Sequence, residues 1–422
     1  MNLVTTKRWT TLRCRFNLTD IPTSSNRSKR FTFPTYFSTT TGKIQTNIAL
    51  KVSYLGWDYH GFARHDPLPT IEGSLFTALK KTGLIESVEQ SKYSRCGRTD
   101  AGVSAFSQVI GLEVKLKSHE ETGPKIVSML NSNLPKDIQV ISWAYTKPNF
   151  DARHDCISRT YKYYFPRQKL NLDLMKEAGH KFLGTKDFRN FCKVRGAKQL
   201  TQFKRTIFQV SVEASKTLAH LQMPERQICE LTICGRSFLW HQVRCMTAIL
   251  FLVGQGLEAP SIVDTLLNIE ETPSKPHYEM ASELPLVLYD SEYQNLNWNT
   301  STTPDLVAMY WLQRHLEREW QRKMNEAIIL ENLIDALGQT PVTPPSLQNT
   351  LSWSEYWNQG EVQARGAGVD VILGGGSESR VRKYTPLTER QHGIPVGELN
   401  KQYLDRKKFK LSQVLTKSNE NQ

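Results

Sequence analysis

The first part of the chain alternates between segments with strand periodicity and segments with helix periodicity. Apolar and polar positions alternate from Ile48 to Tyr54, which predicts a half-buried strand. An aromatic, glycine-punctuated loop follows at 56–62. Thr70 is a residue type that caps helices, and apolar side chains at helical spacing follow it, which predicts a helix. Further elements are expected as strands at 92–96, 108–116 and 138–145 and a helix at 126–134.

A second set of elements repeats this order. We expect strands at 159–165, 206–214 and 227–234 and helices at 172–183, 238–253 and 261–268. Two successive α+β units with mostly antiparallel pairing fit such an order. A long helix is expected at 303–337, and the Pro, Thr, Ser and Gly content after Gly338 predicts loop. Gly374-Gly375-Gly376 lacks the strand and helix context of a phosphate-binding loop, so we assign it no nucleotide role.

The charge of the chain is positive and unevenly distributed. Its 422 residues carry 54 Lys and Arg against 41 Asp and Glu, a net charge of +13. Residues 149–205 hold 14 of these cations and 5 of the acids, interleaved with nine Phe and Tyr. This mixture suits a nucleic acid, whose phosphates meet cations and whose bases stack on rings. A solvated charged face is the alternative. No helix-turn-helix or zinc-finger pattern points to DNA.

The N-terminal segment has the composition of a targeting sequence. Residues 1–48 contain eight Lys and Arg, one acid, Asp20, and many Ser and Thr. We expect a transit peptide and mitochondrial localisation. The alternative is a disordered, RNA-binding leader on a protein of the cytoplasm and nucleus. No apolar run approaches the roughly 18 residues that cross a bilayer, so no membrane partner is expected. Seven scattered Cys predict reduced thiols and no metal site.

The stretch 93–105 is the most informative for chemistry. It places one carboxylate, Asp100, on a tight loop between strands, after Arg95 and Arg98. A nearby arginine keeps an aspartate ionised and lowers its pKa. An ionised aspartate held in place makes a nucleophile or an electrostatic stabiliser rather than a general acid. Alone, the tripeptide from Asp100 to Gly102 would more often be an Asx turn braced by arginines.

The longer run Arg95-Cys96-Gly97-Arg98-Thr99-Asp100-Ala101-Gly102-Val103 resembles the signature of the TruA family of tRNA pseudouridine synthases. The resemblance extends from residue 48 to about 290, through further matches at 54–62, 150–154, 159–163 and 238–244. Cys245 stands where many members have Asn. Residues 104–110, 275–281, 285–290 and 383–387 most resemble the eukaryotic branch that acts on positions 38 and 39 of the tRNA anticodon arm.

The resemblance implies roles for residues at matching positions. Asp100 is the covalent or charge-stabilising group, Tyr161 stacks on the target base and acts as a base at C5, and Arg244 pairs with Asp100. Substrate-binding roles are implied for five more residues: Arg95, Arg98, Arg153, Arg159 and His241. The reaction needs no cofactor and no metal. Tyr161 packing a core, Arg244 bracing a helix and His241 serving only as a hydrogen-bonded helix residue are the structural alternatives.

The expected fold class is α+β, with two ferredoxin-like subdomains that share a mostly antiparallel sheet and hold the catalytic cleft between them. The expected boundaries are 1–47 for the leader, 48–150 and 151–300 for the N- and C-terminal catalytic subdomains, and 301–422 for a long helix with a loop-rich extension. The implied partner is tRNA, bound by a homodimer. The rival function is a non-catalytic RNA-binding protein or organellar RNA assembly factor built on a synthase scaffold.

Overall fold

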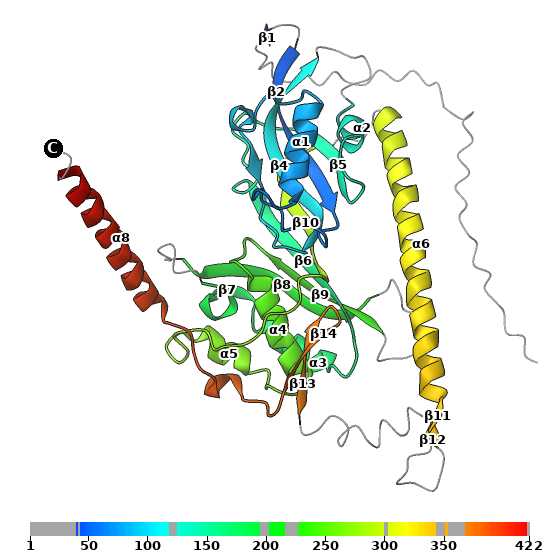
Figure 1. Cartoon of the computed structure of the whole chain (residues 1–422), viewed down its shortest axis with the longest axis vertical. Coiled ribbons are helices and arrows are strands. Elements are labelled where there is room, and N and C mark those ends of the chain that lie inside the picture. The colour runs from blue at the N-terminus through cyan, green and yellow to red at the C-terminus, as the bar shows by residue number, and fades with distance from the viewer. Residues whose placement is uncertain are drawn as a thin grey trace, which may run out of the picture. The chain divides into compact units, whose positions relative to one another are not determined.

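A computed structural model describes residues 39–40, 43–117, 125–194, 202–215, 227–298, 303–342, 351–352 and 368–419 (Figure 1). Of the expected leader, 1–47, only residues 39–40 and 43–47 are described, and they lie in the first two strands of the sheet. No helix among those that are described is long and apolar enough to cross a membrane.

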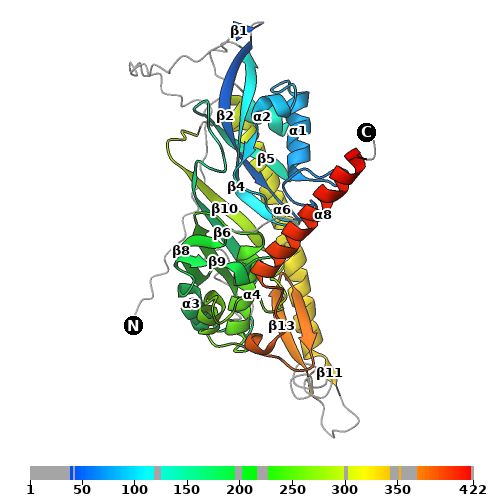
Figure 2. The same cartoon turned by 90° about the vertical axis from the view of Figure 1, so that its left-hand side faces the viewer.

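The described residues build one large mixed α+β fold around a ten-stranded sheet (Figures 1 and 2). Its main strand order is β1-β2-β4-β10-β6-β9-β8-β7, with β3 paired to β4 and β5 paired to β2. Every pairing is antiparallel except that of β10 with β4. The strands are β1 (Thr39–Thr40), β2 (Lys43–Tyr54), β3 (Ser94–Arg95), β4 (Ser104–Lys117), β5 (Ile138–Tyr145), β6 (Cys156–Pro166), β7 (Gly184–Asp187), β8 (Lys204–Ala214), β9 (Ile228–Gly235) and β10 (Leu286–Tyr293).

Two hydrophobic cores lie against the two halves of this sheet. Helix α1 (Ile71–Lys81) and helix α2 (Ile126–Asn131) contribute to the core of the first half, with β2, β4 and β5. Helix α3 (Leu172–His180), helix α4 (Gln242–Gly254) and helix α5 (Ile262–Leu267) contribute to the core of the second half, with β6, β8 and β9. Nearly all of α4 is buried, which explains its almost continuous apolar sequence.

The hairpin in the C-terminal part of the chain folds back on the second half. The chain forms the long helix α6 (Thr303–Gln339), a hairpin of β13 (Val369–Gly374) and β14 (Ser377–Val381), and helix α8 (Val396–Asn419). The hairpin packs on α4. The Gln255 side chain bonds to the Asp370 carbonyl at 2.8 Å and to the Ile372 amide at 3.0 Å. Short elements are β11 (Pro341–Val342), β12 (Leu351–Ser352), and single 3-10 turns at Glu89–Ser91, Arg189–Phe191 and Leu387–Glu389.

Most expected elements are present, and the Thr70 cap is confirmed, because its side chain accepts a hydrogen bond from the Gly73 amide. Two predictions were incomplete. Strand β10, which joins the two halves of the sheet, was not foreseen. The prediction of loop after Gly338 is wrong for β13, β14 and α8. Gly374, Gly375 and Gly376 all have positive φ, at the end of β13 and in the turn before β14.

Candidate active site

The loop that carries Asp100 is held by the aromatic loop at 56–62. The Phe62 amide donates to the Thr99 carbonyl at 3.1 Å, and the Gly102 amide donates to the Tyr59 carbonyl at 3.1 Å. Gly56 lies so close that a Cβ there would overlap the Val103 carbonyl. The carboxylate therefore sits on a loop whose backbone is fixed on both sides, immediately before β4 begins to pair with β10.

The side chains that surround Asp100 belong to the start of α4 and to the loop before β10. His241 Nε2 lies 3.5 Å from Asp100 Oδ2. Burial raises the pKa of Asp100 above its ordinary value, and the Arg244 charge and a hydrogen bond from the Trp240 side chain partly offset this. The Glu283 carboxylate raises the pKa further. The expectation that neighbouring arginines set a lowered pKa is corrected, because burial outweighs them.

Arg244 reaches the site from the first turn of α4. Its Nε donates to the Ala281 carbonyl at 2.7 Å, and its Nη2 lies 2.7 Å from Glu283 Oε2. The expected direct pairing with Asp100 is therefore replaced by an ion pair with Glu283. Arg244 still acts on Asp100 through space, since its charge lowers the pKa of that carboxyl. Asp100, Arg244 and Glu283 form one electrostatic group.

Tyr161 lies between the two hydrophobic cores and packs against both. It is on β6, opposite Leu288 of β10 and Ile233 of β9. The centroid of its ring lies 5.1 Å from that of Phe238, nearly perpendicular to it. Burial raises the pKa of the Tyr161 phenol, and the Asp100 charge adds to the rise. The expected Asp100, Tyr161 and Arg244 are thus brought together by the fold.

The four other arginines predicted to bind substrate occupy different positions. Arg98 and Arg153 are exposed on loops beside the site. Arg95 forms an ion pair with buried Glu72, away from Asp100. Arg159 is 7% exposed, and its guanidinium donates to the carbonyls of three residues: Cys96, Arg153 and Arg236. These donors hold the loops around the site, and the substrate-binding role of Arg159 stays a prediction.

Two residues of the site were missed in the sequence. Glu283 falls between the recognised segments 275–281 and 285–290, and Trp240 lies inside the recognised segment 238–244 without an assigned role. His241 has a left-handed backbone, with φ of 62°. Helix α4 begins directly after this residue, and both His241 and Trp240 interact with Asp100. Only the fold reveals that these residues share one site.

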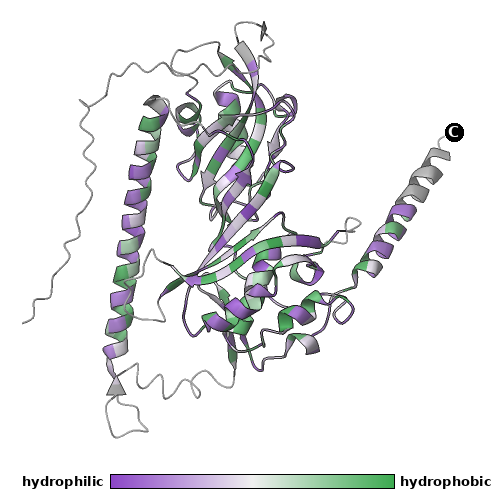
Figure 3. Ribbon diagram, turned by 180° about the vertical axis from the view of Figure 1, so that it is seen from behind, coloured by the Kyte–Doolittle hydropathy of each residue, from purple (hydrophilic) through white to green (hydrophobic). Residues whose placement is uncertain are grey.

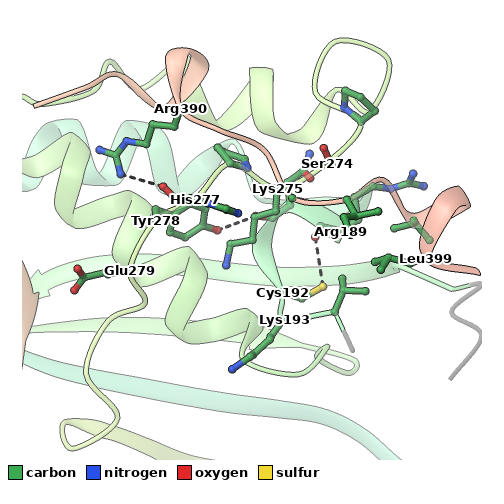
Figure 4. A pocket seen from close by; sticks show the side chains of 17 residues that line it. Arg189, Cys192, Lys193, Ser274, Lys275, His277, Tyr278, Glu279, Arg390 and Leu399 are labelled. Carbon is green, nitrogen blue, oxygen red and sulfur yellow. Dashed lines mark hydrogen bonds between the residues drawn. The ribbon is translucent and has the colours of Figure 1, made fainter. Parts of the chain in front are cut away.

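A cavity of about 740 Å³ lies elsewhere on the second half, between residues 189–194, 273–279 and 390–399 (Figure 4). Its described lining includes none of Asp100, Tyr161 and Arg244. The Lys275 ammonium group lies over the Tyr278 ring, 4.1 Å from its centroid, and 3.2 Å from Cys245 Sγ. Because this cavity lacks the carboxylate, we assign the chemistry to the Asp100 site.

A half-buried carboxylate beside an aromatic ring, with exposed arginines at its edge, defines a class of site that suits enzymes modifying a nucleobase in RNA. The ring can stack on an extruded base while the arginines meet phosphates. Comparisons with known proteins agree. The sequence model of a family described as tRNA pseudouridine synthase matches residues 178–294.

Individual relatives extend the match over most of the chain. The tRNA pseudouridine(38/39) synthase of Homo sapiens is 39% identical over 367 residues, which cover 82% of this chain and 74% of the relative. The enzyme of the same name from Saccharomyces cerevisiae is 46% identical over 277 residues, 62% of this chain and 61% of the relative. tRNA pseudouridine synthase A of Methanosarcina acetivorans is 31% identical, over 68% of this chain and 97% of the relative. The chain belongs to the TruA family of tRNA pseudouridine synthases, as its motifs predicted.

Proposed function

We propose that this chain isomerises uridine to pseudouridine at positions 38 and 39 of the tRNA anticodon stem-loop. The main support for this proposal is that Asp100, Tyr161 and Arg244 lie close together, where the two hydrophobic cores adjoin. The names of the eukaryotic relatives support the two positions. An extruded uridine replaces its stacking in the RNA by stacking on a protein ring, at a cost of roughly a few kcal/mol for leaving the stem.

The reaction breaks the bond between N1 of uracil and C1′ of ribose and forms a bond between C5 and C1′. C5 loses a proton and N1 gains one, so atoms and electrons balance without a cofactor. Asp100 serves as the nucleophile or charge-stabilising group at this bond. Arg244 favours the charged form of Asp100, which is the form that either role needs. Tyr161 stacks on the base and accepts the C5 proton as a phenolate, after its own proton has passed to N1. Burial raises the pKa of this phenol, which makes its phenolate a strong base.

Four finer assignments belong to the same proposal. The two halves of the sheet act as ferredoxin-like subdomains with the catalytic cleft between them. The exposed Arg98 and Arg153 contact the RNA backbone.

The active form is a homodimer that binds one tRNA across both copies. Residues 1–47 direct the chain to mitochondria, which the eight Lys and Arg against one acid in residues 1–48 support; cytoplasm and nucleus are the alternative.

The test is the Asp100→Asn variant, assayed by tritium release from tRNA labelled at C5 of uridine. We expect the rate to fall on the order of a thousandfold or more, with tRNA binding largely retained. The control is Asp173→Asn, which removes an 89% exposed carboxylate from α3 and should leave the rate unchanged. Undiminished release by Asp100→Asn would refute the proposal and favour a non-catalytic RNA-binding protein.

A further inference from the structure

Trp57 presents an indole ring that is fixed in place and open to solvent. The residue belongs to the aromatic loop at 56–62 and is 52% exposed. Its Nε1 donates a hydrogen bond to the Leu284 carbonyl at 3.1 Å. Most tryptophans bury the larger part of their surface, because the ring is large and mainly apolar. An indole that is held by a hydrogen bond and still half exposed offers a preformed apolar surface to a ligand.

The residues on either side of Trp57 bind the segment that carries Asp100. The Gly56 amide donates a hydrogen bond to the Ser104 hydroxyl at 3.0 Å. Two residues after Trp57, the Tyr59 carbonyl accepts a hydrogen bond at 3.1 Å from the amide two residues after Asp100. The backbone under the indole ring is therefore held against the loop that carries the carboxylate.

The partner of the Trp57 hydrogen bond also touches this loop. A Cβ built on Gly102 would come within 2.7 Å of Glu283 Cγ and 3.5 Å of Leu284 Cδ2. The aromatic loop, the Asp100 loop and the segment before β10 therefore meet at one place. Trp57 lies there, at the edge of the Asp100 site.

The position of Trp57 suits a base that remains outside the catalytic group. Extrusion of the target uridine leaves its neighbours in the RNA without a stacking partner. Tyr161 packs against both hydrophobic cores, so its ring serves the extruded base itself. Trp57 stands half exposed at the edge, where the RNA strand must pass to deliver the uridine to Asp100. A neighbouring base can stack on this ring in place of the uridine that has left the stem.

The charges beside Trp57 favour a base over a phosphate as its partner. Asp58, the next residue, is exposed and carries a negative charge that repels phosphates. Arg98, exposed on the Asp100 loop, supplies a positive charge for the RNA backbone. Aromatic rings that meet bases, together with cations that meet the backbone, are the features of grooves that bind single-stranded RNA. We therefore expect the indole to meet a base and the arginine to meet a phosphate.

We propose that Trp57 is a substrate-binding residue that stacks on a base adjacent to the target uridine. The inference rests on the proposed function and adds a contact outside the group formed by Asp100, Tyr161 and Arg244. Stacking on the indole offsets part of the free energy that extrusion of the uridine costs. Because every base has a π face, the contact does not depend on which of the four bases occupies the adjacent position.

The first experiment compares Trp57→Ala with Trp57→Phe by equilibrium binding of tRNA to the full chain. Asp100→Asn serves as the parent chain, so that the bound RNA keeps its uridine. Trp57→Ala loses the stacking contact and should weaken binding roughly 5- to 150-fold. Trp57→Phe keeps an aromatic ring but loses the hydrogen bond to the Leu284 carbonyl, and should bind within about threefold of the parent chain. Circular dichroism checks that all chains remain folded.

Two outcomes of this comparison overturn the proposal. Equal weakening by Trp57→Ala and Trp57→Phe would show that the residue acts only through its hydrogen bond to Leu284. Unchanged binding by Trp57→Ala would show that the indole makes no contact with the RNA.

The second experiment identifies the base by removing it from the RNA. Two tRNAs are prepared with an abasic nucleotide on the 5′ or the 3′ side of the target uridine. One of the two should bind the parent chain more weakly than complete tRNA does. This loss should disappear in Trp57→Ala, because the ring that stacks on the base is already absent. If both abasic tRNAs lose the same factor with Trp57→Ala as with the parent chain, the proposal is wrong.

Trp320 of α6 supplies a matched control. It is 58% exposed, and hydrophobic residues recur along this helix (Figure 3). Trp320→Ala should respond to the abasic tRNAs as the parent chain does, because this indole does not stack on the missing base. The salt dependence is a further readout. Stacking involves no phosphate charge, so Trp57→Ala should leave the slope of binding against salt concentration unchanged. A reduced slope, or the same response in Trp320→Ala as in Trp57→Ala, contradicts the proposal.

The binding measurements are independent of isomerisation. If the unsubstituted chain releases tritium normally and Trp57→Ala binds tRNA as the parent chain does, this inference fails and the proposed function stands. If the unsubstituted chain releases no tritium, the proposed function fails, whatever the binding of Trp57→Ala.

Discussion

At the scale of single residues, the charge of Asp100 is set by groups that are far apart in the sequence. Burial disfavours the carboxylate, Arg244 favours it, and Glu283 acts against it while holding Arg244 in place. The motif around Asp100 could be recognised from sequence because its residues are contiguous. Glu283 could not be found in this way, since its partner Arg244 lies 39 positions earlier and the pairing depends on the loop before β10.

This arrangement predicts opposite shifts of the pH profile for two substitutions. The reaction needs ionised Asp100, so the rate falls as pH drops through the pKa of that carboxyl. Arg244→Gln removes the charge that lowers this pKa, and the acidic limb should move to higher pH. Glu283→Gln removes a charge that raises it, and the acidic limb should move to lower pH. Single-turnover rates between about pH 4.5 and 8 measure both shifts; shifts in the same direction would contradict the assignment.

At the scale of elements, the C-terminal hairpin braces the loop that holds Arg244. The Leu373 carbonyl of β13 accepts hydrogen bonds from the Ser282 amide at 2.7 Å and from the Tyr163 hydroxyl at 3.3 Å. Ser282 lies between Ala281 and Glu283, the two residues that bind Arg244. A segment whose composition predicts loop therefore contributes to the positioning of Arg244.

Gly374 provides the test of this bracing, with Gly376 as a matched control. Both glycines have φ of 78°, so an alanine at either position carries the same backbone penalty. A Cβ at Gly374 would overlap the Tyr163 hydroxyl, whereas a Cβ at Gly376 meets open space. We expect Gly374→Ala to be less stable than Gly376→Ala by about 1–3 kcal/mol in denaturant unfolding, with a lower turnover. Equal stability of the two variants would show that the hairpin does not pack as described.

Strand β10 and the hairpin of β13 and β14 were missed in the sequence for a shared physical cause. Strands β2 and β5 were predicted because one face is buried and the other is more exposed, so their apolar residues alternate. In β10 the residues Leu286, Val287 and Leu288 are all buried, and the short run carries no period. In the β13 and β14 hairpin, stability comes from docking on α4 rather than from its own composition. Tertiary packing decides such segments, and local pattern does not reveal it.

At the scale of the whole molecule, the two halves of the sheet are joined through a short seam. Strand β10 pairs with β4 in parallel at Val287 and Leu288, and with β6 in antiparallel fashion along its length. The β4 side of this seam begins four residues after Asp100, and Tyr161 lies opposite Leu288 on the β6 side. The seam therefore fixes the loop of one half against the tyrosine of the other.

This architecture predicts that Leu288 matters for turnover beyond its part in stability. Leu288 and Leu130 of α2 are both fully buried in the core of the first half. Truncating either to alanine should cost about 2–5 kcal/mol of unfolding free energy. At a temperature where both variants are folded, Leu288→Ala should have the lower kcat, because it loosens the contact between the β4 and β6 sides at the active site. Leu130→Ala acts on the outer side of the same core and should keep its kcat. If the two variants lose kcat equally, the pairing of β10 with β4 and β6 contributes to stability only. The loops alone would then position the site.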